Sequence, residues 1–118
     1  MNIFDFNKFK VILDYGHNKH AMDALSKMLP KMAKGRKIGI CHGSGNRKDE
    51  LLKEFAAIIA KTYDYIIITD LDIRQRKLGE TAKIVRKGIL TTGFDEKSIE
   101  VILDVHKAVD RAFDIVKE

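Results

Sequence analysis

Short apolar runs and longer amphipathic stretches alternate along the chain. Four short runs rich in apolar residues are typical of strands, and they cover residues 9–15, 36–41, 64–69 and 99–103. The run at 9–15 is nearly all apolar, so we expect it to form a central strand covered on both faces. Residues 3–6 predict a further strand, and Asn7 and Lys8 fit a tight turn that joins the two as a hairpin.

Between these runs, apolar residues recur at helical spacing. The amphipathic stretches cover residues 18–32, 51–62, 78–90 and 105–116. Pro30 should disturb the last turn of the first helix, and Gly93 should stop the third. Strands alternating with helices predict an α/β domain: a Rossmann-like, mostly parallel sheet flanked by helices on both faces, with a small N-terminal β-hairpin. With 118 residues and no linker or repeat, residues 1–118 should form a single domain.

Cysteine content and hydropathy indicate the compartment. The single cysteine, Cys41, excludes an internal disulfide and suits the reducing cytoplasm. Its neighbour His42 brings none of the further ligands that a zinc site needs, so we expect no metal site. No apolar run approaches the roughly 20 residues of a membrane span. Asp5 and Lys8 interrupt the amino-terminal apolar residues, unlike the apolar core of a secretory signal. The sequence therefore predicts a cytoplasmic protein with no membrane partner.

The chain is basic, with a net charge of +5 at pH 7. Its densest basic stretch comprises Lys27, Lys31, Lys34, Arg36 and Lys37. Cations are favourable near a helix carboxyl end, and charge runs of this kind usually form a solvated surface. Nucleic-acid binding would favour aromatic side chains interleaved with the basic ones, and this stretch has none. A nucleic-acid partner is therefore disfavoured.

Three polar loops follow predicted strands, at residues 14–18, 42–49 and 70–76. The carboxyl ends of parallel strands lie at one edge of a sheet, which is where ligands bind in such folds. The three loops should therefore share one rim. This arrangement predicts that the domain carries a polar site there.

Each loop has a functional interpretation and a purely structural one. Asp14, His17 and Asn18 could meet a phosphate at a helix start, or could be a surface histidine beside a helix cap. The glycine-rich loop at 43–49 resembles a phosphate cradle, although it lacks the Gly-Lys-Ser/Thr ending of a P-loop and the third glycine of the dinucleotide fingerprint. The third loop could grip an amino acid or a metal-bound nucleotide, or could pair its own charges in solvent; it carries Asp70, Asp72, Arg74 and Arg76.

Together the three loops resemble the carboxy-terminal domain of the Mur ligases, and within that family most closely that of the cyanophycin synthetases. Residues 13–18 read Leu-Asp-Tyr-Gly-His-Asn, similar to Asp-Tyr-Ala/Gly-His-Asn-Pro in the family. Residues 45–49 read Gly-Asn-Arg-Lys-Asp, similar to Gly-Asp-Arg-Arg-Asp. Residues 72–76 read Asp-Ile-Arg-Gln-Arg and precede Gly79-Glu80, similar to Asp-x-Arg-Gly-Arg followed by Gly-Glu. The resemblance covers nearly the whole chain.

The resemblance implies part of an ATP-dependent carbon–nitrogen ligase. Such enzymes phosphorylate a carboxylate with ATP, and the amine of an amino acid attacks the acyl phosphate. A central P-loop domain, absent here, holds most of the ATP and Mg²⁺, so the isolated chain should be inactive. In cyanophycin synthetases the Mur-like half adds arginine to an aspartate side chain, which suggests an arginine-like substrate. A free-standing, non-catalytic binding or regulatory module of the same fold is the alternative.

The resemblance also implies roles for individual residues. His17, Asn46 and Arg47 would serve catalysis, with Asp14, His17 and Asn18 beside ATP. The incoming amino acid would be bound by Asp70, Asp72, Arg74 and Arg76.

The chain departs from the family pattern in several places. Lys19 replaces the family's proline, and Asn46 replaces a frequent aspartate, which removes a charge near any phosphate. The family's final strand and its arginine-bearing hinge are missing, so we expect a fragment. Its exposed sheet edge could support a homo-oligomer.

Overall fold

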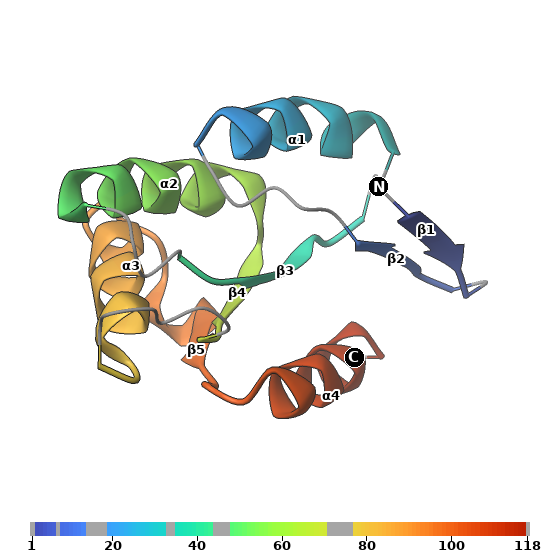
Figure 1. The fold of residues 1–118 in the computed structure, drawn as a ribbon. Coiled ribbons are helices and arrows are strands. Elements are labelled where there is room, and N and C mark those ends of the chain that lie inside the picture. The colour runs from blue at the N-terminus through green and yellow to red at the C-terminus, as the bar shows by residue number, and fades with distance from the viewer. Residues whose placement is uncertain are drawn as a thin grey trace.

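The computed structural model describes residues 2–6, 8–13, 19–32, 35–43, 48–70 and 77–117. Figure 1 shows a small sheet between helices, with a hairpin set to one side. The elements in chain order are β1 (Asn2–Asp5), β2 (Lys10–Leu13), α1 (Lys19–Met32), β3 (Ile38–Cys41), α2 (Asp49–Thr62), β4 (Tyr65–Ile68), α3 (Glu80–Leu90), the short 3-10 helix η1 (Glu96–Ser98), β5 (Ile99–Val101) and α4 (Val105–Val116).

The sheet of the described chain is parallel, in the order β3-β4-β5. In the central strand β4, Ile66, Ile67 and Ile68 are fully buried. A continuous apolar run suits this position, because each strand face is covered by helices. The predicted α/β class and parallel sheet are confirmed.

Successive isoleucines of β4 enter two separate cores because strand side chains point alternately to opposite faces. Ile66 and Ile68 pack with residues of α1, α2 and α3 on one face. Ile67 packs with Ala108 and Ile115 of α4 on the other. Figure 1 shows the same layers, with α4 alone below the sheet.

The N-terminal hairpin forms as predicted, but one prediction about it is wrong. β1 and β2 pair antiparallel, with Ile3 opposite Ile12. We expected residues 9–15 to form a doubly covered central strand. Within the described residues β2 pairs only with β1, and Leu13 is 55% exposed. An apolar run indicates that a strand tends to be buried, but it does not indicate which segment buries it. β2 pairs with β1, the strand nearest to it in the sequence.

The helices follow the amphipathic pattern with small shifts at their ends. Pro30 lies inside α1, which ends at Met32 as predicted. α3 begins at Glu80 rather than residue 78, so Leu78, which we expected in its buried face, precedes the helix and is 66% exposed. Gly79 interrupts the helical phase there, with a φ of 86° that few other residues adopt. Within the described residues no helix combines the length and apolar character needed to cross a membrane.

Candidate functional site at the carboxyl ends of the strands

The carboxyl ends of β3, β4 and β5 lie at one end of the sheet, because the strands are parallel and adjacent. His42 and Gly43 continue from β3, and Thr69 and Asp70 continue from β4. The predicted common rim is therefore confirmed for those parts of the second and third loops that the structure describes.

Of the predicted site residues, only Asp70 lies within the described part of the chain. The others lie outside it, so their roles and mutual geometry stay predictions; they are Asp14, His17, Asn18, Asn46, Arg47, Asp72, Arg74 and Arg76.

Thr69 joins the three strand ends at the rim. Its backbone N–H donates to the Cys41 carbonyl of β3 at 2.9 Å, and its hydroxyl donates to the Leu103 carbonyl after β5 at 2.8 Å. The residue is 2% exposed, so its hydroxyl is a buried polar group with a partner. Sequence reasoning missed this role, although a threonine directly after three isoleucines is a signal for it.

Asp70 follows immediately and contacts the start of α3. Its backbone N–H donates to the Leu103 carbonyl at 3.3 Å. One oxygen of its half-buried carboxylate, Oδ2, accepts a short hydrogen bond from the backbone N–H of Gly79. This charged acceptor lies at a helix amino end, where the helix dipole favours a negative charge. The side chain therefore links the end of β4 to the beginning of α3.

Gly43 brings the chain after β3 close to α2 and α3. A Cβ atom at this buried position would lie 2.7 Å from Leu52 Cδ2, 2.8 Å from Thr81 Cγ2 and 3.1 Å from Val85 Cγ2. Real Cβ atoms essentially never come within 3.0 Å of another atom, so a larger residue here would have to displace buried neighbours, and packing favours glycine. The first glycine of the expected phosphate cradle thus has a structural explanation.

Two buried polar atoms near Gly43 have no hydrogen-bond partner among the described residues: His42 Nδ1 and Thr81 Oγ1. Thr81 is fully buried in the first turn of α3. Such groups are uncommon in folded proteins because an unmade hydrogen bond in the interior is costly. These two atoms could therefore still form hydrogen bonds beside the rim. The sequence analysis did not identify Thr81 as a candidate.

Cys41 lies at the end of β3, beside the rim, but is buried in the core. Burial raises the pKa of the Cys41 thiol from 9.0 to about 12, as expected for a core residue. Among the described residues, no group of three or more His, Cys, Asp or Glu side chains could hold a metal ion.

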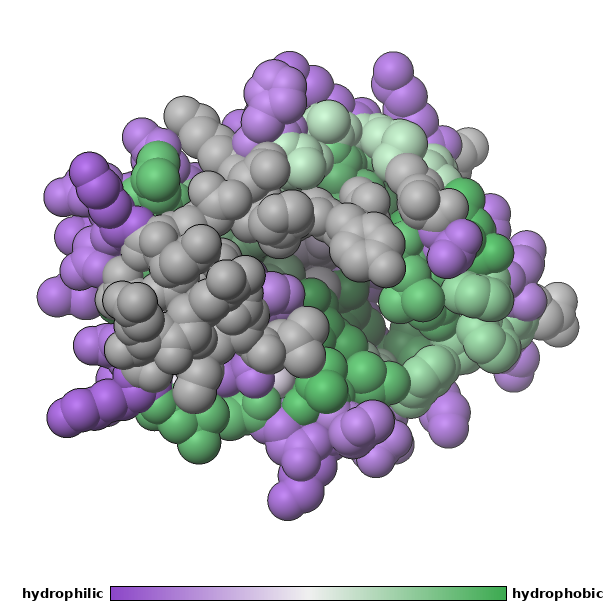
Figure 2. Space-filling view, viewed as in Figure 1, coloured by the Kyte–Doolittle hydropathy of each residue, from purple (hydrophilic) through white to green (hydrophobic). Residues whose placement is uncertain are grey.

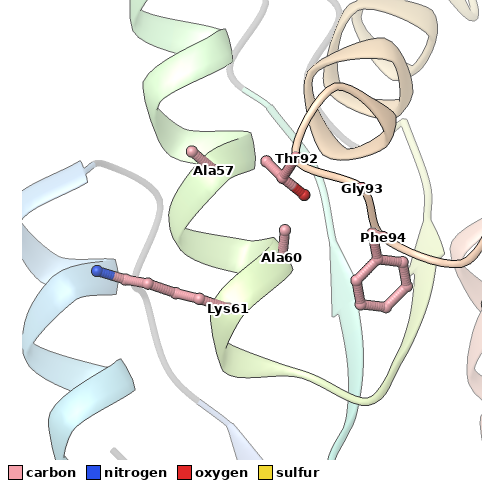
Figure 3. A pocket seen from close by; sticks show the side chains of 6 residues that line it. All are labelled: Ala57, Ala60, Lys61, Thr92, Gly93 and Phe94. Atoms are coloured by element: carbon pink, nitrogen blue, oxygen red, sulfur yellow. The ribbon is translucent and has the colours of Figure 1, made fainter.

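A shallow hollow of about 290 Å³ lies elsewhere on the domain. Its lining residues come from α2 and from the turn after α3; they are Ala57, Ala60, Lys61, Thr92, Gly93 and Phe94. The Lys61 side chain extends away from Phe94 (Figure 3). α2 ends just before β4, and Phe94 precedes β5, so the hollow lies near the amino ends of the strands. It is therefore separate from the candidate site.

The fold and rim define an α/β domain in which polar stretches of the sequence follow the carboxyl ends of parallel strands, a usual place for ligands. Comparison with known families makes this assignment specific. Residues 1–118 match the model of the family described as Mur ligase, glutamate ligase domain. The chain belongs to this family.

Related proteins agree with that membership. The chain is 37% identical over 119 residues to cyanophycin synthetase of Synechocystis sp., covering all of this chain and 13% of the relative. It is 32% identical over 113 residues to UDP-N-acetylmuramoyl-L-alanyl-D-glutamate–2,6-diaminopimelate ligase of Aquifex aeolicus, covering 95% of this chain and 22% of the relative.

A solved structure of a ligase with the same name matches with a TM-score of 0.78 at 16% identity. The match covers 92% of this chain and 22% of the other. At this identity the match supports the fold alone. The expected resemblance is confirmed, and the chain corresponds to a small part of the relatives that it matches.

Proposed function

We propose that this chain is the carboxy-terminal, substrate-closing domain of an ATP-dependent amide ligase of the cyanophycin synthetase type. One observation carries the proposal. The end of β3, which leads to Asn46 and Arg47, lies directly beside the end of β4, which leads to Asp72 and Arg74. The Thr69–Cys41 hydrogen bond of 2.9 Å joins these two strand ends. The strand ends that precede two of the motifs resembling those of the ligases thus lie side by side.

The proposed reaction has two steps. A carboxylate oxygen of the acceptor attacks the γ-phosphorus of ATP, forming an acyl phosphate and releasing ADP. The uncharged amine of the incoming amino acid then attacks the acyl carbon, phosphate leaves, and the amine proton passes to a base or solvent. A separate P-loop domain would hold most of the ATP and Mg²⁺, whose charge offsets that of the phosphates. This domain would bind the amino acid and exclude water.

Charge matching favours an arginine-like amino acid. Asp70 or Asp72 would suit the guanidinium, because a carboxylate can accept two parallel hydrogen bonds from it. Arg74 would suit the substrate carboxylate for the same reason. Asp14, His17 and Asn18 would lie near ATP, and Asn46 and Arg47 near the acyl phosphate.

An amide-shift NMR titration of the chain tests the proposal. A non-hydrolysable ATP analogue with Mg²⁺ is added first, and arginine second, with the isolated equivalent domain of the Synechocystis relative as positive control. We expect arginine to shift the amides of His42, Gly43, Thr69 and Asp70, and citrulline, its uncharged analogue, to shift them much less. Shifts in the control domain but none in this chain would contradict the proposal.

The Arg74→Ala variant tests the assignment of the substrate carboxylate. In a ligase completed with its P-loop domain, we expect a higher KM for the amino acid. An unchanged KM would rule that role out.

A further inference from the structure

We infer that Asp70 is a positioning residue: its carboxylate fixes the start of α3 against the end of β4, and thereby sets both ends of the connection that carries Asp72 and Arg74. The inference rests on the proposed function for what the connection binds. In this role Asp70 does not contact the substrate; it acts indirectly, by positioning the residues that do.

Three hydrogen bonds meet at this junction. The Asp70 carboxylate accepts from the Gly79 N–H. The Asp70 N–H donates to the Leu103 carbonyl at 3.3 Å, and the neighbouring Thr69 hydroxyl donates to the same carbonyl at 2.8 Å. The ends of β4 and β5 and the beginning of α3 are therefore joined within two consecutive residues of the chain.

The backbone at Gly79 explains why a side chain is needed there. Gly79 precedes the first residue of α3 and has φ 86° and ψ −13°, in the left-handed region. It has no side chain with which to cap the helix. Its N–H finds its acceptor on Asp70, while the next N–H, of Glu80, donates to the Lys77 carbonyl at 3.0 Å. Asp70 thus supplies from the end of β4 an acceptor for the N–H of the cap residue. In many helices this acceptor is a side chain in the helix's own first turn.

The same hydrogen bond argues against a direct grip on a guanidinium. A guanidinium binds a carboxylate best through two parallel hydrogen bonds, which require both oxygens. Each carboxylate oxygen can accept more than one hydrogen bond, but Oδ2 of Asp70 already accepts from Gly79 and the charge is offset by the amino end of α3. Asp70 therefore attracts a guanidinium less strongly than a carboxylate without these contacts would, and we assign the guanidinium to Asp72.

The consequence for binding is geometric. Asp70 and Gly79 flank the connection in the sequence, and the hydrogen bond between them holds its two ends together. Substrate-binding groups must be held within a fraction of an ångström to act together. Loss of the Asp70 acceptor should therefore weaken arginine binding even though Asp70 does not touch the ligand.

Two substitutions at position 70 separate the roles. Asp70→Asn keeps a carbonyl acceptor for Gly79 but removes the negative charge, whereas Asp70→Ala removes both. For Asp70→Ala we expect faster hydrogen exchange at the Gly79 amide and an arginine Kd raised about tenfold, the effect of about one hydrogen bond. For Asp70→Asn we expect slow exchange at Gly79 and a Kd within about threefold of the wild type. Equal loss of arginine affinity in both variants would mean that the charge contacts the substrate, and would overturn the inference.

Gly79→Ala disturbs the same junction from the opposite side. The φ of 86° is strained for alanine, whereas space is not limiting, since the nearest atom to an added Cβ is Leu103 Cδ1 at 3.7 Å. We expect this variant to lose arginine affinity as Asp70→Ala does. Unchanged affinity in Gly79→Ala beside a loss in Asp70→Ala would also overturn the inference.

The ligand-free exchange rate separates this inference from the proposed function. Wild-type protein that binds no arginine contradicts the function. Unaltered Gly79 exchange in Asp70→Ala contradicts the positioning role, whether or not arginine binds.

Discussion

Arg111 on α4 holds Glu100 on β5 through its Nε, which lies 2.9 and 3.1 Å from the two carboxylate oxygens. The Tyr65 hydroxyl of β4 donates a short hydrogen bond to the same carboxylate. The three side chains lie on the sheet face covered by α4, beside the small apolar core around Ile67. They give α4 a defined position that its few apolar contacts alone would specify less well.

Removing the Tyr65 hydroxyl should weaken this arrangement in a pH-dependent way. Burial, followed by the hydrogen bond and charge of Glu100, raises the pKa of Tyr65 above its ordinary value of 10.0. The folded pKa exceeds the unfolded one, so this stabilisation is complete below about pH 10 and is lost as pH rises through the folded pKa. We expect Tyr65→Phe to lower the free energy of unfolding by about 1 kcal/mol at pH 7, and the difference to shrink at alkaline pH. Urea titrations of both proteins from pH 7 to 11 measure this; a constant difference would contradict it.

How far the sequence predicts this fold depends on how local each feature is. The isoleucines of β4 form a strand as predicted, and they are buried because helices cover both faces of the sheet there. The similar apolar run of β2 led to a wrong prediction, because the hydropathy of a strand does not determine which strand it pairs with, and β2 pairs with β1. Periodicity indicates that a segment is a strand, whereas its neighbours are fixed by the tertiary structure.

The candidate site shows the same limit. Topology alone predicted that the loops after β3 and β4 would share a rim, and their described first residues lie there. The structural role of Asp70 could not be predicted, because it depends on α3 beginning at Glu80 rather than at residue 78. The burial of Thr81 likewise depends on how closely Gly43 approaches α3.

Close packing between α2 and α3 makes Gly88 a sensitive position. A Cβ there would lie 2.8 Å from Ala56 Cβ. We expect Gly88→Ala to lower the free energy of unfolding by about 1–3 kcal/mol, despite the better helix propensity of alanine. Gly35→Ala is the matched control, because an added Cβ there meets nothing within 4 Å. Thermal unfolding of both variants, of Ala56→Gly and of the double variant measures the effect. Ala56→Gly is itself destabilising inside a helix, so the loss caused by Gly88→Ala is compared with and without it. An equal loss in both backgrounds would exclude this contact as the cause.

The buried thiol of Cys41 should be inert in the folded protein. With its pKa at about 12, the thiolate fraction at pH 8 is about a thousandfold below that of an exposed cysteine. We expect a disulfide reagent to label native protein at least that much more slowly than protein in concentrated urea. Cys41→Ala, which should take no label, is the control. Rapid labelling of the native protein would show that the end of β3 opens readily.

An aromatic cluster should hold the hairpin to the body of the domain. Phe113 of α4 packs edge-on against Phe6 and Phe9, with ring centroids 6.2 and 5.8 Å away. Phe113→Ala should cost about 1–3 kcal/mol of unfolding free energy and speed hydrogen exchange at the β1 and β2 amides. Val109→Ala on the same helix, at a 38% exposed position, is the control. Equal exchange rates in the two variants would show that other contacts hold the hairpin.

Exposed apolar residues on the hairpin are a competing surface for association. Ile3, Phe4 and Leu13 are each about half exposed. Figure 2 shows hydrophobic residues gathered on this side of the molecule. Any test of association through the sheet must therefore change the sheet edge and leave the hairpin intact.

The outer strand β5 should mediate self-association. Within the described residues it pairs only with β4, and Val101 is 42% exposed. The one charged side chain of β5, Glu100, is held by Arg111 of α4, so it does not block the strand edge, and an unblocked edge can add a strand from a second copy. We expect sedimentation equilibrium to show a mass that rises with concentration, and Val101→Lys to abolish the rise. Val109→Lys, which places the same charge on α4, should leave it unchanged. If the mass of the Val101→Lys variant still rises with concentration, the association occurs through another surface, such as the hairpin. If the wild-type protein is a monomer at every concentration, edge pairing is contradicted.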